Sequence, residues 1–285
     1  MKQAMFYEKM DHNRVLCTLC PHGCVLTEGS TGNCRARKSM EGRLYSVNYG
    51  CVASVALDPI EKKPLYHFHP GKLILSAGTF GCNFKCGYCQ NWTIAHRDVR
   101  TAVIRPSELA EMAQKYTGQG NIGIAYTYNE PSIWYEFVLE TAELVREKGL
   151  VNVLVTNGFI NKDPLERLLP FIDAMNIDVK AFTEDFYKKY CRGSLEHVMR
   201  TVERAAERCH VEITTLIIPG LNDSPDEIDK LAEWISSISP DIVLHLSRFF
   251  PNYEMNDIPP TPPEILHAVR ERTLAHLRHV YLGNV

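Results

Sequence analysis

The sequence lacks a strong charge of either sign and has no long hydrophobic run. Its 285 residues carry a formal net charge of -3, with acidic and basic residues intermixed, which gives no electrostatic case for binding nucleic acid or an acidic membrane surface. No stretch approaches the roughly 20 apolar residues of a membrane span, and the N-terminal MKQAMFYEKMDHNR lacks the apolar core of an export signal. We therefore expect a cytoplasmic protein without nucleic-acid or membrane partners.

Internal repeats and low-complexity tracts are also missing, and from residue 72 onward short β-rich runs alternate with longer amphipathic stretches. This alternation is typical of a parallel sheet with crossover helices. A complete eightfold barrel needs about 250 residues, whereas 214 remain after residue 71. The sequence therefore predicts an α/β fold, a partial (βα)6 TIM-like barrel over residues 72–285 behind a small Cys-rich N-terminal module over residues 1–71. The expected strands are Leu73–Ala77, Ile122–Tyr126, Val151–Thr156, Ala174–Asp178, Glu212–Ile218 and Ile242–Leu246, and the expected helices include Pro106–Tyr116, Ser132–Glu147, Leu195–Arg208 and Pro225–Ser237.

Ten cysteines are present, and eight of them lie before residue 90. Clustered cysteines without an export signal indicate metal ligation rather than disulfides. The segment GTFGCNFKCGYCQNW places Cys82, Cys86 and Cys89 just after the first expected strand, at the mouth of the barrel where catalytic groups collect. Three thiolates satisfy three irons of a [4Fe–4S] cluster and leave the fourth open for a ligand. Core cysteines or zinc ligands are the alternative, but core cysteines have no reason to crowd a glycine-rich loop.

Polar residues recur at the ends of the next expected strands. Glu130 in YTYNEP is placed to accept charge-assisted hydrogen bonds from an ammonium group, although a carboxylate at a helix N-terminus has the same location. Thr156 and Asn157 in TNGF can bond a ribose or carboxylate, although turns favour the same residues. Asp178 and Lys180 in NIDVK share one side of a strand end, although such a pair is usually a surface ion pair.

The cysteine triad, with Tyr88 before its last cysteine, resembles the signature of the radical S-adenosylmethionine (SAM) superfamily. The resemblance implies that SAM chelates the open iron of a [4Fe–4S] cluster, and that an electron from the cluster cleaves SAM to a 5'-deoxyadenosyl radical. The strand-end motifs over residues 72–222, in this order, resemble those of the oxidoreductases that activate glycyl-radical enzymes, such as the pyruvate formate-lyase activating enzyme. The residues that we assign to the cofactor are Tyr88, Gln90, Asn129, Glu130, Thr156, Asn157, Asp178, Lys180 and His245.

A second array of cysteines occupies the segment LCTLCPHGCVLTEGSTGNCRAR, at Cys17, Cys20, Cys24 and Cys34. Four thiolates can close a zinc site or hold an auxiliary iron–sulfur cluster, and reduced thiols without a ligand are a third interpretation. With the barrel motifs and the later HLSRFFPNYEM, the array resembles the radical SAM enzyme of the AmmeMemoRadiSam system. That resemblance implies Memo-like and AMMECR-type partners, and reduction of the cluster implies a flavodoxin or ferredoxin as electron donor.

Three functions remain open at this point. The chain is a radical SAM enzyme acting on an unidentified small molecule or protein, an activase acting on the glycine of a partner protein, or an iron–sulfur redox or carrier protein that does not turn over SAM. His245, Arg248 and Tyr253 lie at or after the sixth expected strand, where they contact substrate or merely bond backbone at the barrel edge. Cys191 and Cys209 lack metal spacing and are expected to be simple thiols.

Overall fold

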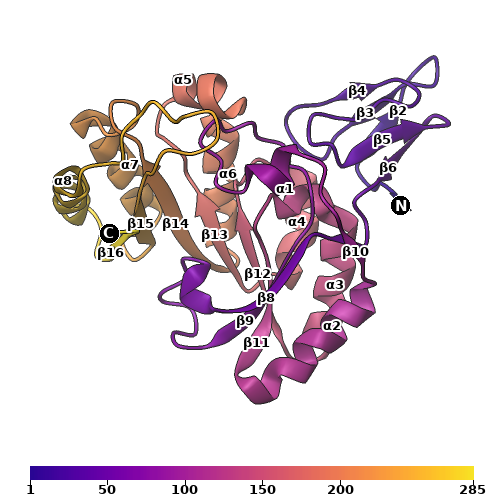
Figure 1. Ribbon diagram of the computed structural model, residues 1–285, viewed down its shortest axis with the longest axis horizontal. Coiled ribbons are helices and arrows are strands. Elements are labelled where there is room, and N and C mark those ends of the chain that lie inside the picture. The colour runs from indigo at the N-terminus through magenta and orange to yellow at the C-terminus, as the bar shows by residue number, and fades with distance from the viewer.

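Eight strands form one curved, open sheet in the computed structural model, which describes residues 1–285 (Figure 1). The strand order is β16-β15-β14-β13-β12-β11-β9-β8, and every neighbouring pair from β9 to β16 is parallel. The outer strands β8 and β16 do not pair with each other, so the barrel is partial, as predicted. The parallel strands are β9 (Leu73–Gly78), β11 (Asn121–Tyr126), β12 (Val151–Thr156), β13 (Ala174–Asp178), β14 (His210–Ile217), β15 (Val243–Arg248) and β16 (Val280–Gly283).

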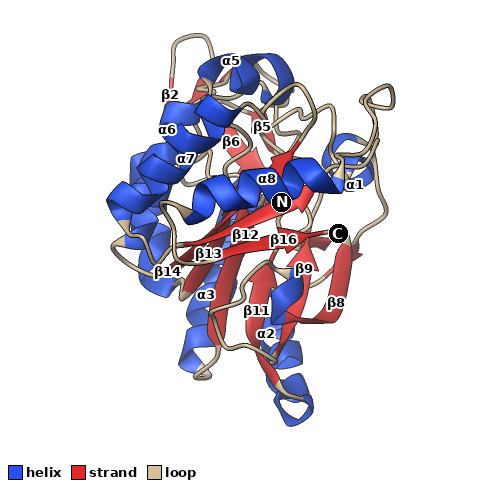
Figure 2. Cartoon of the chain, turned by 90° about the vertical axis from the view of Figure 1, so that its left-hand side faces the viewer, coloured by secondary structure: helices blue, strands red, loops and turns tan.

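Amphipathic helices cover the outer side of this sheet (Figure 2). In α6, Val198, Val202 and Ala205 recur at helical spacing and are fully buried. Prolines begin α2, α7 and α8, where their missing N–H group costs no hydrogen bond. The longer helices are α2 (Pro106–Lys115), α3 (Tyr135–Glu147), α4 (Lys162–Leu168), α6 (Leu195–Ala206), α7 (Pro225–Ile238) and α8 (Pro263–Leu274), and the short ones are α1 (Trp92–His96), α5 (Glu184–Phe186), the π-helical η5 (Tyr187–Cys191) and the 3-10 segments η1 (Ile60–Lys62), η2 (Tyr116–Gln119), η3 (Pro131–Trp134) and η4 (Leu169–Phe171).

The sheet begins before the boundary that was expected at residue 72. Strand β8 (Ser54–Pro59) pairs antiparallel with the whole of β9, from Ser54 opposite Gly78 to Pro59 opposite Leu73. The residues of β8 are half-buried or exposed, as is typical of a sheet edge. The strand therefore lacks the alternation of buried and exposed residues by which a strand is recognised in a sequence. The barrel sheet therefore includes residues that the sequence assigned to the N-terminal module.

The N-terminal module itself consists of two small antiparallel sheets at the upper right of Figure 1. It docks on the start of α3, where the buried Arg37 guanidinium pairs with Glu136 at 2.7 Å and the Trp134 indole N–H donates to the Asn48 carbonyl at 2.8 Å. One contiguous apolar core joins module residues such as Val15 to the barrel. No helix has the length and apolar character needed to cross a bilayer. The module strands are β1 (Lys2–Gln3), β2 (Tyr7–Lys9), β3 (Val15–Cys17), β4 (Val25–Leu26), β5 (Arg37–Met40) and β6 (Arg43–Ser46), and β7 (Cys51–Val52) pairs with β10 (Ala102–Val103).

Candidate active site

Three free cysteines, Cys82, Cys86 and Cys89, lie on the loop between β9 and α1 and are called the triad below. They are close enough to affect one another's ionisation. Burial, with the charges of Glu130 and of the other two thiols, raises the pKa of Cys82, and burial raises that of Cys89 to about 11. A hydrogen bond from Cys191 lowers the pKa of Cys86 although the thiol is buried. The loop therefore gathers three sulfur ligands in a partly desolvated place.

Amide side chains at the ends of β11 and β12 hold this loop in position. Asn129 accepts from the Thr79 N–H at 3.1 Å and donates to the Gly81 carbonyl at 2.8 Å. Asn157 donates to the Asn83 side chain at 2.8 Å, and the same nitrogen lies 3.7 Å from the Cys82 sulfur. Both asparagines, which the sequence assigned to the cofactor, thus contact the loop itself.

Glu130 links the ends of β11 and β12 through hydrogen bonds. It is 1% exposed, and its carboxylate accepts from the Thr156 hydroxyl at 2.7 Å, the Asn157 N–H at 2.8 Å and the Ser132 N–H at 2.9 Å. Burial raises its pKa, against these three donors. One oxygen accepts a single bond and keeps acceptor capacity, so a contact with an ammonium group stays open as a prediction.

The ion pair at the end of β13 faces the other two cysteines. Lys180 and Asp178 are joined at 2.8 Å, with side chains 18% and 30% exposed, and both act electrostatically on Cys86 and Cys89. Burial disfavours the Lys180 cation, but the charges of Asp178 and Cys86 outweigh burial and raise its pKa. The cation thus lies where bound thiolates would place negative charge.

Of the remaining assigned residues, Tyr88 lies beside the triad, whereas His245 bonds elsewhere in the barrel. The His245 ring donates to the buried Glu212 at 2.6 Å, and the Tyr88 hydroxyl lies 3.3 Å from the Cys191 sulfur. Gln90 is exposed. Arg248 donates to the Thr261 carbonyl at 2.7 Å, which is the backbone bonding named above as its alternative.

Sequence reasoning missed Cys191, which lies beside Cys86 and Tyr88. It ends the π-helical η5, and its carbonyl accepts from the Lys85 N–H of the triad loop at 2.8 Å. Its distance along the chain from the other cysteines gave no signal. The π-helix, a rare element that is frequent at functional sites, is visible only in the structure.

The donor set of the triad, three free thiols on one loop, fits an iron–sulfur cluster. Thiolates are the ligands that such clusters use, and three of them leave one iron open. The triad would therefore hold a [4Fe–4S] cluster with one free position.

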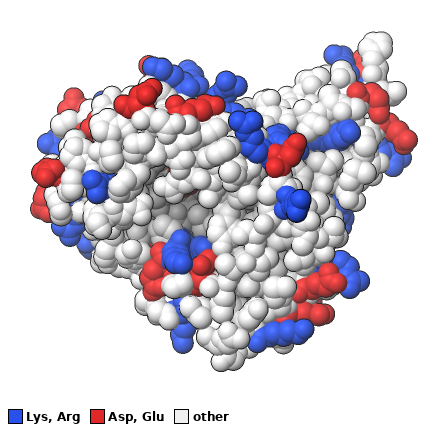
Figure 3. Space-filling view, viewed as in Figure 1, with Lys and Arg blue, Asp and Glu red and all other residues white.

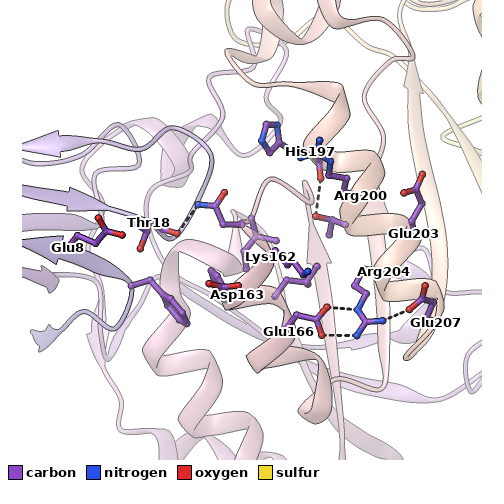
Figure 4. Close-up of a pocket in the computed structure, with 16 residues that line it drawn as sticks. Glu8, Thr18, Lys162, Asp163, Glu166, His197, Arg200, Glu203, Arg204 and Glu207 are labelled. Atoms are coloured by element: carbon purple, nitrogen blue, oxygen red, sulfur yellow. Dashed lines mark hydrogen bonds and ion pairs between the residues drawn. The ribbon is translucent and has the colours of Figure 1, made fainter.

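Two of the hollows in the molecule bear on the position of the triad. Figure 3 shows a hollow in the middle of one face, bordered by uncharged atoms except at its lower edge, where Lys or Arg and Asp or Glu side chains lie. A groove of about 1140 Å3 lies between the N-terminal module and helices α4 and α6 (Figure 4), but none of the triad lines it. Among its lining residues, Arg204 pairs with Glu166 and Glu207.

Comparison with known proteins gives consistent matches. The family model of the Radical SAM superfamily matches residues 77–235. An uncharacterized protein of Methanocaldococcus jannaschii is 44% identical over all of this chain and 86% of its own length. The pyruvate formate-lyase-activating enzyme of Clostridium pasteurianum is 28% identical over 55% of this chain and 67% of its own length. A radical SAM methyltransferase structure from Sphaerobacter thermophilus shares the fold at a TM-score of 0.59 and 16% identity, over 75% of this chain and 67% of that one.

Proposed function

The chain belongs to the radical SAM superfamily, and from this premise we propose that it is an enzyme that abstracts hydrogen from an unidentified substrate. The family uses a [4Fe–4S] cluster and SAM, and the reduced cluster, when bound, supplies the electron that breaks a carbon–sulfur bond of SAM to give a 5'-deoxyadenosyl radical. The observation that carries the proposal is the loop of three free thiols with Glu130 and Lys180 beside it.

Each of these residues has a distinct proposed role. The triad holds three irons, and Asn129 and Asn157 fix the loop through their hydrogen bonds to Thr79, Gly81 and Asn83. The Glu130 oxygen that accepts only one bond is placed near Cys82, where an anionic acceptor orients the ammonium group of SAM. The Lys180 cation offsets negative charge beside Cys86. The cofactor roles of Tyr88, Gln90, Thr156, Asp178 and His245 are proposals of the same kind.

A second candidate function is activation of a glycyl-radical enzyme. The similarity to the pyruvate formate-lyase-activating enzyme over 55% of the chain favours it. In that case the substrate would be a glycine in a partner protein, whose loop would have to reach SAM bound at the cluster. A flavodoxin- or ferredoxin-type donor, and Memo-like and AMMECR-type partners, are proposed from the resemblance and are testable by copurification.

The proposal is tested by anaerobic reconstitution with iron and sulfide, followed by dithionite and SAM and an assay for 5'-deoxyadenosine. The wild type is expected to form the product and Cys86→Ala to form none. Cys209→Ala is the matched control, because this half-buried thiol lies outside the triad and donates to the Ala205 carbonyl. Cluster-loaded wild type that forms no product would favour the iron–sulfur carrier instead. Equal product from wild type and Cys86→Ala would exclude the triad as the site.

A further inference from the structure

A strained turn follows the end of β11, directly before Asn129 and Glu130. Tyr128 at its centre has φ +71°, and the Asn129 N–H donates to the Thr127 carbonyl at 3.0 Å. A hydrogen bond that spans a single residue of positive φ is the mark of the rare, strained form of the γ-turn. A bulky residue at positive φ is an outlier, and such outliers persist only where surrounding contacts fix them. The contacts of Tyr128 should therefore explain why this turn is kept.

Asp58 of β8 and Lys63, which follows η1, hold the Tyr128 side chain and are called the clamp. The Tyr128 hydroxyl donates to Asp58 Oδ2 at 3.0 Å, and the Lys63 ammonium pairs with the same oxygen at 2.8 Å. This ammonium also lies 4.9 Å from the centre of the Tyr128 ring, within the range of a cation–π contact. Burial opposes ionisation of Asp58, but the hydrogen bond and the charge of Lys63 outweigh it and lower the pKa to about 2. The carboxylate therefore stays an acceptor at neutral pH.

The turn is also packed against β9. A Cβ at Gly78 would lie 2.6 Å from the Thr127 carbonyl oxygen and 3.0 Å from the Tyr128 ring, so only glycine leaves room for the turn at this position. Strands β8, β9 and β11 are neighbours in the sheet (Figure 1), and β9 leads directly into the triad loop. Contacts from both neighbouring strands therefore fix the turn.

The position of Glu130 depends on this turn. A change of φ at Tyr128 rotates every atom that follows it, and Glu130 is only two residues further along the chain. In the observed turn the Glu130 carboxylate accepts from the Thr156 hydroxyl and the Asn157 N–H at the end of β12. The strain at Tyr128 is thus located where it sets the direction of the acid that we assign to SAM.

We propose that Asp58 and Lys63 are positioning residues for SAM, because they keep Tyr128 in the γ-turn that places the Glu130 carboxylate at the site of the SAM ammonium group. This inference rests on the proposed function. The clamp acts through Tyr128 and does not itself have to touch SAM. Both clamp residues belong to the segment that the sequence assigned to the N-terminal module, so that segment contributes to the geometry of the cofactor site.

The test measures SAM affinity per loaded cluster by anaerobic titration calorimetry of the full chain, reconstituted with iron and sulfide. Tyr128→Gly frees the backbone to leave the turn and should weaken SAM binding about tenfold, as expected when a hydrogen bond to a charged group is misplaced. Tyr128→Phe keeps the ring beside Lys63 and should have intermediate affinity. Asp58→Leu/Lys63→Met removes the clamp without leaving a charge unpaired and should weaken binding as Tyr128→Gly does. Glu41→Gly is the matched control, because Glu41 also has a positive φ, +52°, but lies in an exposed turn of the module.

The control should bind SAM like the wild type, and an equal loss of affinity in it would overturn the proposal. Unchanged affinity in Tyr128→Gly or in the clamp variant would overturn it as well, because the turn would then not position Glu130. Should Tyr128→Gly fail to fold, the clamp variant still decides, since replacing an ion pair by apolar side chains of similar volume is often tolerated. Cluster-loaded wild type that binds no SAM refutes the proposed function itself, whereas wild type and variants that bind SAM equally refute only the positioning role.

Discussion

The contact between Gly81 and the N-terminal module leads to a prediction with an internal control. Gly81 has φ +89°, and a Cβ would lie 2.3 Å from the Cys34 carbonyl oxygen. Gly120 has nearly the same φ, +93°, but nothing lies within 4 Å of its Cβ position. Alanine at either position suffers the strain of a left-handed backbone, about 1–2 kcal/mol. Only alanine at Gly81 also collides with backbone.

The collision sets the expected difference between the two variants. Inserting an atom into a packed place costs about 1–3 kcal/mol, so Gly81→Ala should lose that much more stability than Gly120→Ala. For a domain of this size each kcal/mol is worth roughly 2–4 °C in Tm, so the extra loss is roughly 2–12 °C. Differential scanning calorimetry of anaerobically purified protein measures it.

The iron content provides a second measurement of the same contact. Displacement of the loop should lower iron incorporation in Gly81→Ala and leave it unchanged in Gly120→Ala. Equal Tm losses and equal iron contents in the two variants would refute the reasoning, because the added methyl group at Gly81 would then make no unfavourable contact with the module. A loss confined to iron would show that the loop moves without unfolding the barrel.

Three further predictions concern buried groups. Burial opposes ionisation of Glu212, but hydrogen bonds from histidines and backbone N–H groups outweigh it and lower the pKa from 4.5 to about 2, so the charge contributes about 3 kcal/mol that is present above pH 4.5 and is lost as the pH falls toward 2. Glu212→Gln should remove this contribution at pH 7. In thermal unfolding, the difference in Tm between the variant and wild type should become smaller as the pH falls from 4.5 to 2, and a difference that does not change with pH would contradict the assignment. Cys191→Ala removes a thiol that lies beside Cys86 and Tyr88, and it should lower the reduction potential of the triad cluster because one potential hydrogen-bond donor to its sulfur is lost, whereas Cys191→Ser should stay near wild type in a redox titration. Glu130→Gln places an amide N–H against a donor and should cost about 1–3 kcal/mol while weakening SAM binding in calorimetry; unchanged SAM affinity would remove Glu130 from the cofactor site.

The parallel part of the fold could be predicted from the sequence because each buried strand is a short apolar run followed by a helix with its own start signal. Strand β12 begins and ends at the predicted residues, Val151 and Thr156, and α7 begins at the predicted Pro225. Glu130 and Lys180, which were singled out because they follow the ends of neighbouring strands, lie near Cys82 and Cys86 respectively. Parallel strands share one carboxyl edge, so order along the chain was enough.

Contacts that depend on tertiary packing could not be predicted in this way. Nothing in the order of residues pairs His245 with Glu212, or places Cys191 beside Cys86. Asn129 was assigned to the cofactor from its motif, but its side chain bonds the triad loop through both of its polar atoms. Motifs identify which residues gather at a site, whereas the partner of each polar atom is decided by geometry.

The boundary expected at residue 72 shows why composition alone misleads about function. It separates a cysteine-rich segment from an α/β segment, yet β8 completes the barrel sheet from the module side, and Arg37 from the module pairs with Glu136 of α3. Removing one partner of a buried ion pair costs about 3–5 kcal/mol, because the other charge is left uncompensated. Gly81 then rests on Cys34, and Asn83 is bonded by His22. The triad loop is therefore held by the barrel on one side and by the module on the other, and the unit that positions its thiols is both segments together.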